Sequence, residues 1–291
     1  MSTPLSPRAV PAAELPEPSA AATPAGVARP DAAAESTKTR RLALLALPDL
    51  PLVRPGDDLA GLLATALAAG GGVEPGDVLV LAQKIVSKAE GRYVDLAAVV
   101  PSAEAERLGV ETEKDARLVE VILRESRRVV RHSKHVLIVE HRCGFVMANA
   151  GIDRSNVDPV EGSDPVLLLP EDADASALRL HHALSARLGT PLAVVISDSF
   201  GRPWRQGTVG VALGAAGLPA LQDLRGEPDL YGRPLRVTET GFADEIAAAA
   251  SLLMGQGAEG QPAVLVRGLA FDGPPRPAAD LIRGSGEDLF R

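Results

Sequence analysis

The sequence predicts a mixed α/β fold, and two observations carry this prediction. Short runs rich in valine and leucine alternate along the chain with longer amphipathic or alanine-rich segments, as strands alternate with helices. Glycine, proline, serine or aspartate separates these segments at most junctions, as turns and helix caps require. Of the 291 residues 46% are hydrophobic and only 3% are aromatic, so we expect an aliphatic core.

Residues 1–40 are rich in alanine, proline, serine and threonine, and they lack the apolar stretch of a secretory signal. Such a composition buries too little apolar surface to offset the entropy lost on ordering. We therefore expect a disordered tail at 1–40, followed by one folded domain at 41–291.

The elements of the folded part follow from hydrophobic period and from stop signals. Valine- and leucine-rich runs predict strands at 40–47, 78–82, 135–140, 144–148, 166–169, 192–196, 235–237 and 263–267. Helical spacing, capping aspartate or serine, and closing glycine predict helices at 57–69, from 102 onwards for a short stretch, and at 115–126, 174–188 and 242–254. The last helix is rich in small residues at 247–250, a face that permits close packing, including against another subunit.

Charge and cysteine content exclude several classes of protein. The net charge of −8 argues against nucleic acid as a partner, and no apolar run approaches the length of a membrane span. The single cysteine, Cys143, excludes an internal disulfide and fits a reducing compartment, so we expect a cytoplasmic protein. Because Cys143 lies between two apolar runs, we interpret it as core filler rather than as a nucleophile.

A carboxylate and a hydroxyl, Asp198 and Ser199, directly follow the predicted strand at 192–196. Gly201 and Pro203 are expected to force a loop there, which also carries two arginines. Ligands of α/β proteins sit at such strand ends, and oxygen ligands followed by guanidinium groups suit a metal-bound phosphate. The alternative is an ordinary turn or helix cap.

Two further polar segments follow predicted strands. The loop at 149–156 offers a second carboxylate, Asp153, although an Asx-turn is the alternative. Lys84 and Lys88 follow the strand at 78–82 and could meet phosphate, or they could form a solvated edge.

Residues 255–260 match the pattern G-x-G-x-x-G. A helix precedes these glycines and a strand follows them, which is the reverse of a dinucleotide-binding motif, and no Walker lysine is present. The loop could still bring backbone amides close to a nucleotide, or it could be a plain connection. Gln256 adds another oxygen. Oxygen ligands select Mg²⁺ or Mn²⁺ over zinc, and basic residues nearby suggest nucleotide phosphate chemistry.

Several phrases together resemble the coenzyme F420-0:L-glutamate ligase family. They are residues 82–91, 149–157, 196–205, 229–233, 243–248 and 266–269, and the resemblance covers about residues 42 to 269. Each phrase alone would be weak, but together they are specific.

The resemblance implies a GTP-dependent ligase that joins the amino group of L-glutamate to the terminal carboxylate of coenzyme F420-0 and later to γ-carboxylates. GTP would first phosphorylate the carboxylate, and the amine would then attack the acyl phosphate. It also implies Mg²⁺ or Mn²⁺, with two ions per subunit, stimulation by K⁺, and an intertwined homodimer of a distinctive α/β fold. No nucleic acid or membrane partner is implied.

The resemblance also carries over residue roles. The metal ligands would be Asp153, Asp198, Ser199 and Gln256. The GTP contacts would be Leu47, Pro48, Asp49, Leu50, Gln83, Lys88, Asn156, Met254, Gly255, Gln256, Gly257, Ala258, Glu259, Gly260 and Gln261. Lys88, Arg202 and Arg205 are candidates for binding phosphate or substrate, and no catalytic base is assigned.

Three departures from the family pattern qualify the resemblance. Ser199 stands where relatives often have threonine, and Gln83 stands where some have serine. The chain ends without the FMN-binding domain that follows in some actinobacterial relatives, so we expect no bound flavin, and the number of glutamates added stays open.

Two other functions stay open at this point. The chain could be an amide ligase acting on a different carboxylate acceptor, or a non-catalytic nucleotide-binding relative. The latter would be favoured by loss of a metal carboxylate or of Lys88, and these residues are present. A metal-dependent phosphatase fits less well, because the glycine loop and basic groups suit retention of a nucleotide.

Overall fold

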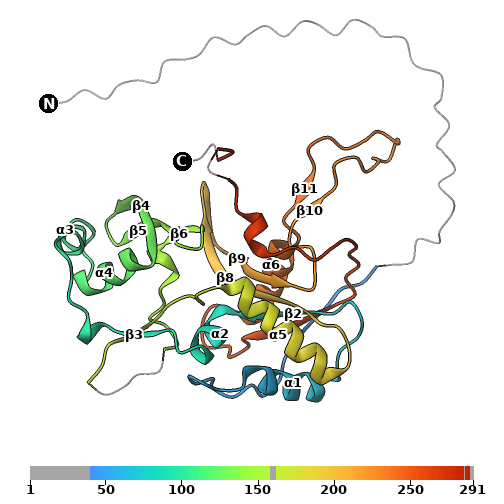
Figure 1. Ribbon diagram of the computed structural model, residues 1–291, viewed down its shortest axis with the longest axis horizontal. Coiled ribbons are helices and arrows are strands. Elements are labelled where there is room, and N and C mark those ends of the chain that lie inside the picture. The colour runs from blue at the N-terminus through green and yellow to red at the C-terminus, as the bar shows by residue number, and fades with distance from the viewer. Residues whose placement is uncertain (1–39, 158–161, 285, 289–291) are drawn as a thin grey trace, which may run out of the picture.

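A five-stranded sheet forms the centre of the computed structural model, which describes residues 40–157, 162–284 and 286–288 (Figure 1). The strands lie in the order β1 (Ala43–Ala46), β12 (Ala263–Arg267), β2 (Val78–Ala82), β8 (Ala193–Arg202) and β9 (Arg205–Ala216). Only the pair β2 and β8 is parallel, and the other neighbours are antiparallel. The mixed α/β class is confirmed, while the tail expected at 1–40 lies almost wholly outside the described residues.

Helices cover both faces of this sheet. On one face lie α1 (Leu59–Ala69), α2 (Gln83–Ala89) and α5 (Ala173–Leu188), and on the other lies α6 (Phe242–Met254) (Figure 1). Alternate residues of β2 point to the two sides, so that Leu79 and Leu81 join one buried cluster and Val78 and Val80 the other. A strand buried on both faces reads as a continuous apolar run, which is why this strand was predictable.

A smaller three-stranded sheet forms a second layer beside the central one (Figure 1). It consists of β4 (Ser126–Ser133), β5 (Val136–His141) and β6 (Val146–Ala148), packed against α3 (Ala103–Thr112) and α4 (Ala116–Arg124). Its buried cluster is separate from those of the central sheet and includes Val119, Ile122 and Leu137.

Short elements complete the described chain. They are β3 (Tyr93–Asp95) paired with β7 (Pro165–Leu167), β10 (Gln222–Asp223) paired with β11 (Glu239–Thr240), and the 3-10 turns η1 (Leu96–Ala98), η2 (Asn149–Gly151) and η3 (Ala278–Leu281). The chain between β10 and β11 projects from the body as an arm (Figure 1). Within the ranges described, no helix combines the length and apolarity that crossing a membrane demands.

The helix predictions are confirmed, and their caps explain why. The side chain of Asp58 accepts a hydrogen bond from the backbone N–H of Gly61 at 3.0 Å, and that of Ser102 accepts one from Ala105. Such bonds satisfy donors that a helix start leaves unpaired. The bounds of α6 and β12 agree with the predicted 242–254 and 263–267.

Several strand predictions are wrong. The strand expected at 192–196 does not end before Asp198, because β8 continues to Arg202 and turns through Pro203 and Trp204 into β9. The strand expected at 235–237 is absent from the described chain, where β11 begins two residues later. The helix α2 and the strands β3, β4, β9 and β10 were not predicted. Of these, β4 is largely exposed and carries three arginines, so its sequence lacks a strand's alternation.

Candidate functional site

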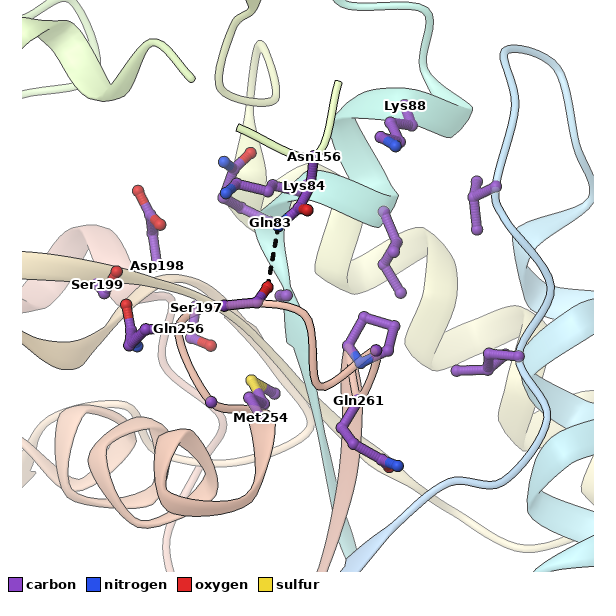
Figure 2. Close-up of a pocket in the computed structure, with 18 of the residues that line it drawn as sticks. Gln83, Lys84, Lys88, Asn156, Ser197, Asp198, Ser199, Met254, Gln256 and Gln261 are labelled. Atoms are coloured by element: carbon purple, nitrogen blue, oxygen red, sulfur yellow. Dashed lines mark hydrogen bonds between the residues drawn. The ribbon is translucent and has the colours of Figure 1, made fainter. Parts of the chain in front are cut away.

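A cavity of about 500 Å³ opens at the carboxyl end of β2, beside its parallel neighbour β8 in the central sheet. Its walls come from the segment after β1, the junction of β2 with α2, the loop at 156–157, the middle of β8 and the connection from α6 to β12 (Figure 2). Five segments far apart in the sequence therefore meet at one place, as a substrate-binding cavity requires.

Gln83 is the first residue of α2 and lies almost fully buried at the cavity wall. The hydroxyl of Ser87, one helical turn later, donates to Gln83 Oε1 at 2.8 Å, and this bond fixes the orientation of the amide. Gln83 Nε2 then donates to Asp153 Oδ2 at 2.9 Å. Lys84 and Lys88 follow on the same helix, four residues apart, and both line the cavity.

Backbone hydrogen bonds hold Asp153 next to the cavity, although Asp153 is not among the residues that line the cavity. Its N–H and C=O both pair with Leu167 at 2.9 Å, after a turn in which Asn149, Ala150 and Gly151 have positive φ. Lys84 Nζ lies 3.4 Å from Asp153 Oδ1. Burial raises the pKa of Asp153, and the charge of Lys84 opposes that rise. The neighbouring Arg154 points away and pairs with Asp164.

Asp198 lies within β8, opposite Val211 of β9, and its carboxyl group lines the cavity. Burial raises the pKa of Asp198 to about 7, and the nearby negative charge of Asp153 adds to the rise. Among the described residues, no lysine or arginine forms an ion pair with Asp198. Its carboxylate is therefore a group that a bound cation would stabilise.

The donor set at this end of the cavity fits Mg²⁺ or Mn²⁺. The side chains of Ser199 and Gln256 lie at the same end as Asp198 (Figure 2). In the part of the chain that the structure describes, no three His, Cys, Asp or Glu side chains form a metal-holding group. Such a site suits Mg²⁺, which typically takes one or two carboxylates and completes its shell with phosphate oxygens and water.

The glycine loop between α6 and β12 forms the wall next to these groups. Gly255 ends α6 with a positive φ, and the Glu259 carboxylate folds back to accept the N–H of Gly257 at 2.7 Å. The carboxamide of Asn156 donates to the carbonyl of Gly257 at 3.3 Å, the bond drawn as a dashed line in Figure 2. The loop therefore lines the cavity mainly with glycine and backbone, which allows close approach of a ligand.

The other side of the cavity is apolar. Residues 50–53, Ile85 and Pro262 line it, and Gln261 lies on the side away from Asp198 (Figure 2). Gln261 Oε1 is buried and accepts no hydrogen bond from any described residue. A buried acceptor without a donor costs stability, so a ligand that donates to it would be favoured.

The cavity brings together most, though not all, of the residues that the sequence suggested. Those that line it are Leu50, Gln83, Lys88, Asn156, Asp198, Ser199, Met254, Gly255, Gln256, Gly257, Ala258, Gly260 and Gln261. Those that do not are Leu47, Pro48, Asp49, Asp153, Arg202, Arg205 and Glu259. Arg202 and Arg205 flank the turn of the β8–β9 hairpin, because β8 continues past the place where a loop was expected.

Sequence reasoning left Lys84 open between a phosphate contact and a solvated edge, and it missed Ser197 and the apolar residues 51–53. A predicted helix at 83–89 would have favoured the site, because it places Lys84 on the same face as Lys88. The apolar residues carry no chemical signal, and only the fold shows that they form a wall.

Comparison with known proteins identifies relatives that cover most of the chain. The family model described as F420-0:gamma-glutamyl ligase matches residues 49–268. The protein from Methanopyrus kandleri named coenzyme F420:L-glutamate ligase is 48% identical over 244 residues, which cover 82% of this chain and 93% of the relative. The proteins of the same name from Methanothermobacter thermautotrophicus and Natronomonas pharaonis are 47% and 46% identical, over 86% and 85% of this chain and 99% and 94% of their own lengths. The chain belongs to the F420-0:gamma-glutamyl ligase family.

Proposed function

We propose that the chain is a GTP-dependent ligase that adds L-glutamate to coenzyme F420-0 through an acyl phosphate. The observation that carries the proposal is the cavity, where the glycine loop, two lysines of α2 and the side chains suited to a metal meet. The name of these relatives, coenzyme F420:L-glutamate ligase, supplies the acceptor and the amino acid.

The reaction has two steps. A carboxylate oxygen of F420-0 attacks the γ-phosphorus of GTP, and GDP leaves with the electron pair of the broken P–O bond. The amine of glutamate then attacks the acyl carbon, an amide bond forms, inorganic phosphate leaves, and the amine loses a proton. Both steps move negative charge among phosphate oxygens, so positioning and charge neutralisation supply most of the catalysis.

The residues in and next to the cavity have distinct roles in this reaction. Lys84 and Lys88 would neutralise phosphate charge, and the backbone of residues 255–260 would approach the phosphates closely. Asp153, Asp198, Ser199 and Gln256 would hold Mg²⁺ or Mn²⁺, which supplies charge neutralisation at the phosphates when it is bound. Each oxygen of Asp153 already faces a donor from α2, so a metal ion at Asp153 would share this carboxylate with Gln83 and Lys84 or displace one of them. The resemblance adds a second divalent ion and K⁺ to the proposal.

One assay tests the proposed function. Purified protein is incubated with F420-0, L-glutamate, GTP and Mn²⁺, and the coenzyme is analysed by mass spectrometry. We expect F420-0 to gain the mass of a glutamyl residue while GTP is converted to GDP and phosphate. Product formation with ATP but not GTP would contradict the nucleotide assignment. Turnover of another carboxylate acceptor, with F420-0 left unchanged, would contradict the substrate assignment.

We also propose a homodimer. The surfaces that support it differ from the small-residue face at 247–250 that the sequence suggested. The small residues of α6 do not form a free face, because Ala243, Ala247 and Ala250 are buried within the chain. Exposed apolar side chains include Leu252 of α6, Trp204 at the β8–β9 turn, and Leu230 and Tyr231 in the arm. Light scattering should give twice the mass of one chain, and a monomer at assay concentrations would contradict this.

A further inference from the structure

Both carboxylate oxygens of Asp153 already have donors from the chain itself. Gln83 Nε2 donates to Oδ2 at 2.9 Å, and Lys84 Nζ lies 3.4 Å from Oδ1. The Lys84 ammonium also donates to Ser155 Oγ at 3.0 Å. With 27% of its side chain exposed, Lys84 is largely enclosed between α2 and the loop that carries Asp153. In this arrangement a metal ion that approaches Asp153 must share its carboxylate with Gln83 and with the positive charge of Lys84.

We propose that Lys84 is an internal counter-cation of the metal site. In the free protein it holds Asp153 and competes with divalent ions for that carboxylate, and the phosphates of a bound nucleoside triphosphate draw its ammonium away. The second half of this proposal rests on the proposed function, whereas the first half concerns the protein alone.

Electrostatics explain why a lysine belongs at this position. Asp153 and Asp198 lie near enough for one charge to disfavour the other, and both feel the positive charge of Lys84. Without a cation nearby, two carboxylates in such a setting repel each other. Lys84 supplies this cation from within the chain, and a divalent ion that enters must displace it or accept its repulsion.

The geometry needs only the contacts of the Lys84 ammonium to change, those with Asp153 and Ser155. Gln83 is held by Ser87 and can stay on Oδ2, so that release of Lys84 frees Oδ1 alone. A lysine carries its charge on a flexible four-carbon stem and can therefore reorient. Lys84 already lines the cavity beside Lys88, so phosphate oxygens in the cavity would lie within its reach.

This role couples metal binding to nucleotide binding. If nucleotide removes the competitor of the metal, each ligand must raise the affinity of the other by the same factor. The divalent ion should then bind weakly to the free protein and tightly together with the triphosphate, which delays assembly of the reactive site until substrate is present.

Manganese binding to the full chain tests the first half without any catalysis. Free Mn²⁺ is measured by electron paramagnetic resonance, with no nucleotide, for the natural protein, Lys84→Met and Lys134→Met. Lys134 is a matched control, because it also forms an ion pair, with Glu113 at 2.9 Å, but lies on the surface. We expect Lys84→Met to bind Mn²⁺ at least about tenfold more tightly, since a positive charge beside the site is lost. Lys134→Met should leave the affinity unchanged.

Two further variants make the result specific. The gain from Lys84→Met should disappear when Asp153→Asn is added, because the competition is for that carboxylate. Lys84→Gln, which keeps a polar side chain, replaces the methionine variant if the latter fails to melt cooperatively. With a non-hydrolysable GTP analogue present, the natural protein should gain much more Mn²⁺ affinity than either Lys84 variant gains.

Unchanged or weaker Mn²⁺ binding in the folded Lys84 variants would overturn the inference, even if the protein proves to be an active ligase. Equal enhancement by the GTP analogue in all variants would overturn the nucleotide-driven release. Conversely, tighter Mn²⁺ binding in a protein that makes no F420 product would support the competition and contradict only the proposed function.

Discussion

Asp198 and Asp153 are close enough that the charge of Asp153, added to the effect of burial, raises the pKa of Asp198 from 3.8 to about 7. A carboxyl group whose pKa is raised by folding stabilises the protein while it is protonated. That contribution is fully present below about pH 4 and is lost as the pH rises through 7. We therefore expect the metal-free protein to lose stability between about pH 4 and pH 7, with an upper bound of roughly 4 kcal/mol from this group.

Asp198→Asn tests this expectation, because asparagine keeps the shape of the side chain and does not titrate. Urea unfolding with a chelator present, at about pH 5 and pH 8, gives the free energy of unfolding of both proteins. The natural protein should become less stable relative to Asp198→Asn as the pH rises. A constant difference between the two would show that Asp198 does not titrate in this range.

The same substitution should abolish most of the ligase activity. If Asp198 holds the divalent ion, loss of its charge removes several kcal/mol of charge stabilisation, and turnover should fall on the order of a hundredfold or more. Asp272→Asn is a suitable control, because Asp272 is an exposed aspartate that does not line the cavity. Near-normal turnover of Asp198→Asn at saturating GTP and Mn²⁺ would contradict the metal assignment.

Gly210 of β9 allows the strand to approach α6 closely. A Cβ at this position would overlap the backbone carbonyl of Ala247, whereas a Cβ at Gly201 in the same hairpin would meet nothing. Neither glycine has a positive φ, so alanine fits both backbones. We expect Gly210→Ala to lower the free energy of unfolding by about 1–3 kcal/mol through overpacking, and Gly201→Ala to change it little. Equal urea midpoints for the two variants would contradict this packing role.

Local signals made the helices other than α2 predictable from sequence. A helix cap involves residues three apart, as with Asp58 and Gly61, and a closing glycine such as Gly189 acts within one turn. These interactions depend on neighbours in the chain, so a single sequence contains the information needed. The same holds for the glycine loop after α6, whose position and cavity-lining role followed from its residues and from the family resemblance.

Long-range pairing explains what the sequence could not provide. The strand through Asp198 continues because β9, a stretch rich in glycine and alanine, pairs with it along its length. Arg202 and Arg205 were therefore expected beside the cavity and lie at a hairpin turn instead. Likewise the hydrogen bond from Gln83 to Asp153 joins residues that are 70 apart in the sequence, and no local pattern of residues predicts it.

Gln261 provides a test of nucleotide specificity. Its Oε1 is buried at the cavity wall and lacks a donor among the described residues, beside the apolar residues that would cover a purine. The guanine edge carries N–H donors that such an acceptor can pair with. Leucine at this position has a similar size but cannot accept. We expect Gln261→Leu to weaken GTP binding by about tenfold, the value of one buried hydrogen bond, and to weaken ATP binding less.

Titration calorimetry with GTP, ATP and inosine triphosphate measures this difference. Inosine triphosphate lacks the 2-amino donor of guanine, so its affinity shows which N–H group meets Gln261. Gln206→Leu is the matched control, because Gln206 is exposed on the β8–β9 hairpin and does not line the cavity. If Gln261→Leu weakens GTP and ATP equally, the residue only supports the wall. If it weakens neither, the base lies elsewhere, because a buried acceptor that had paired with guanine could not be lost without cost.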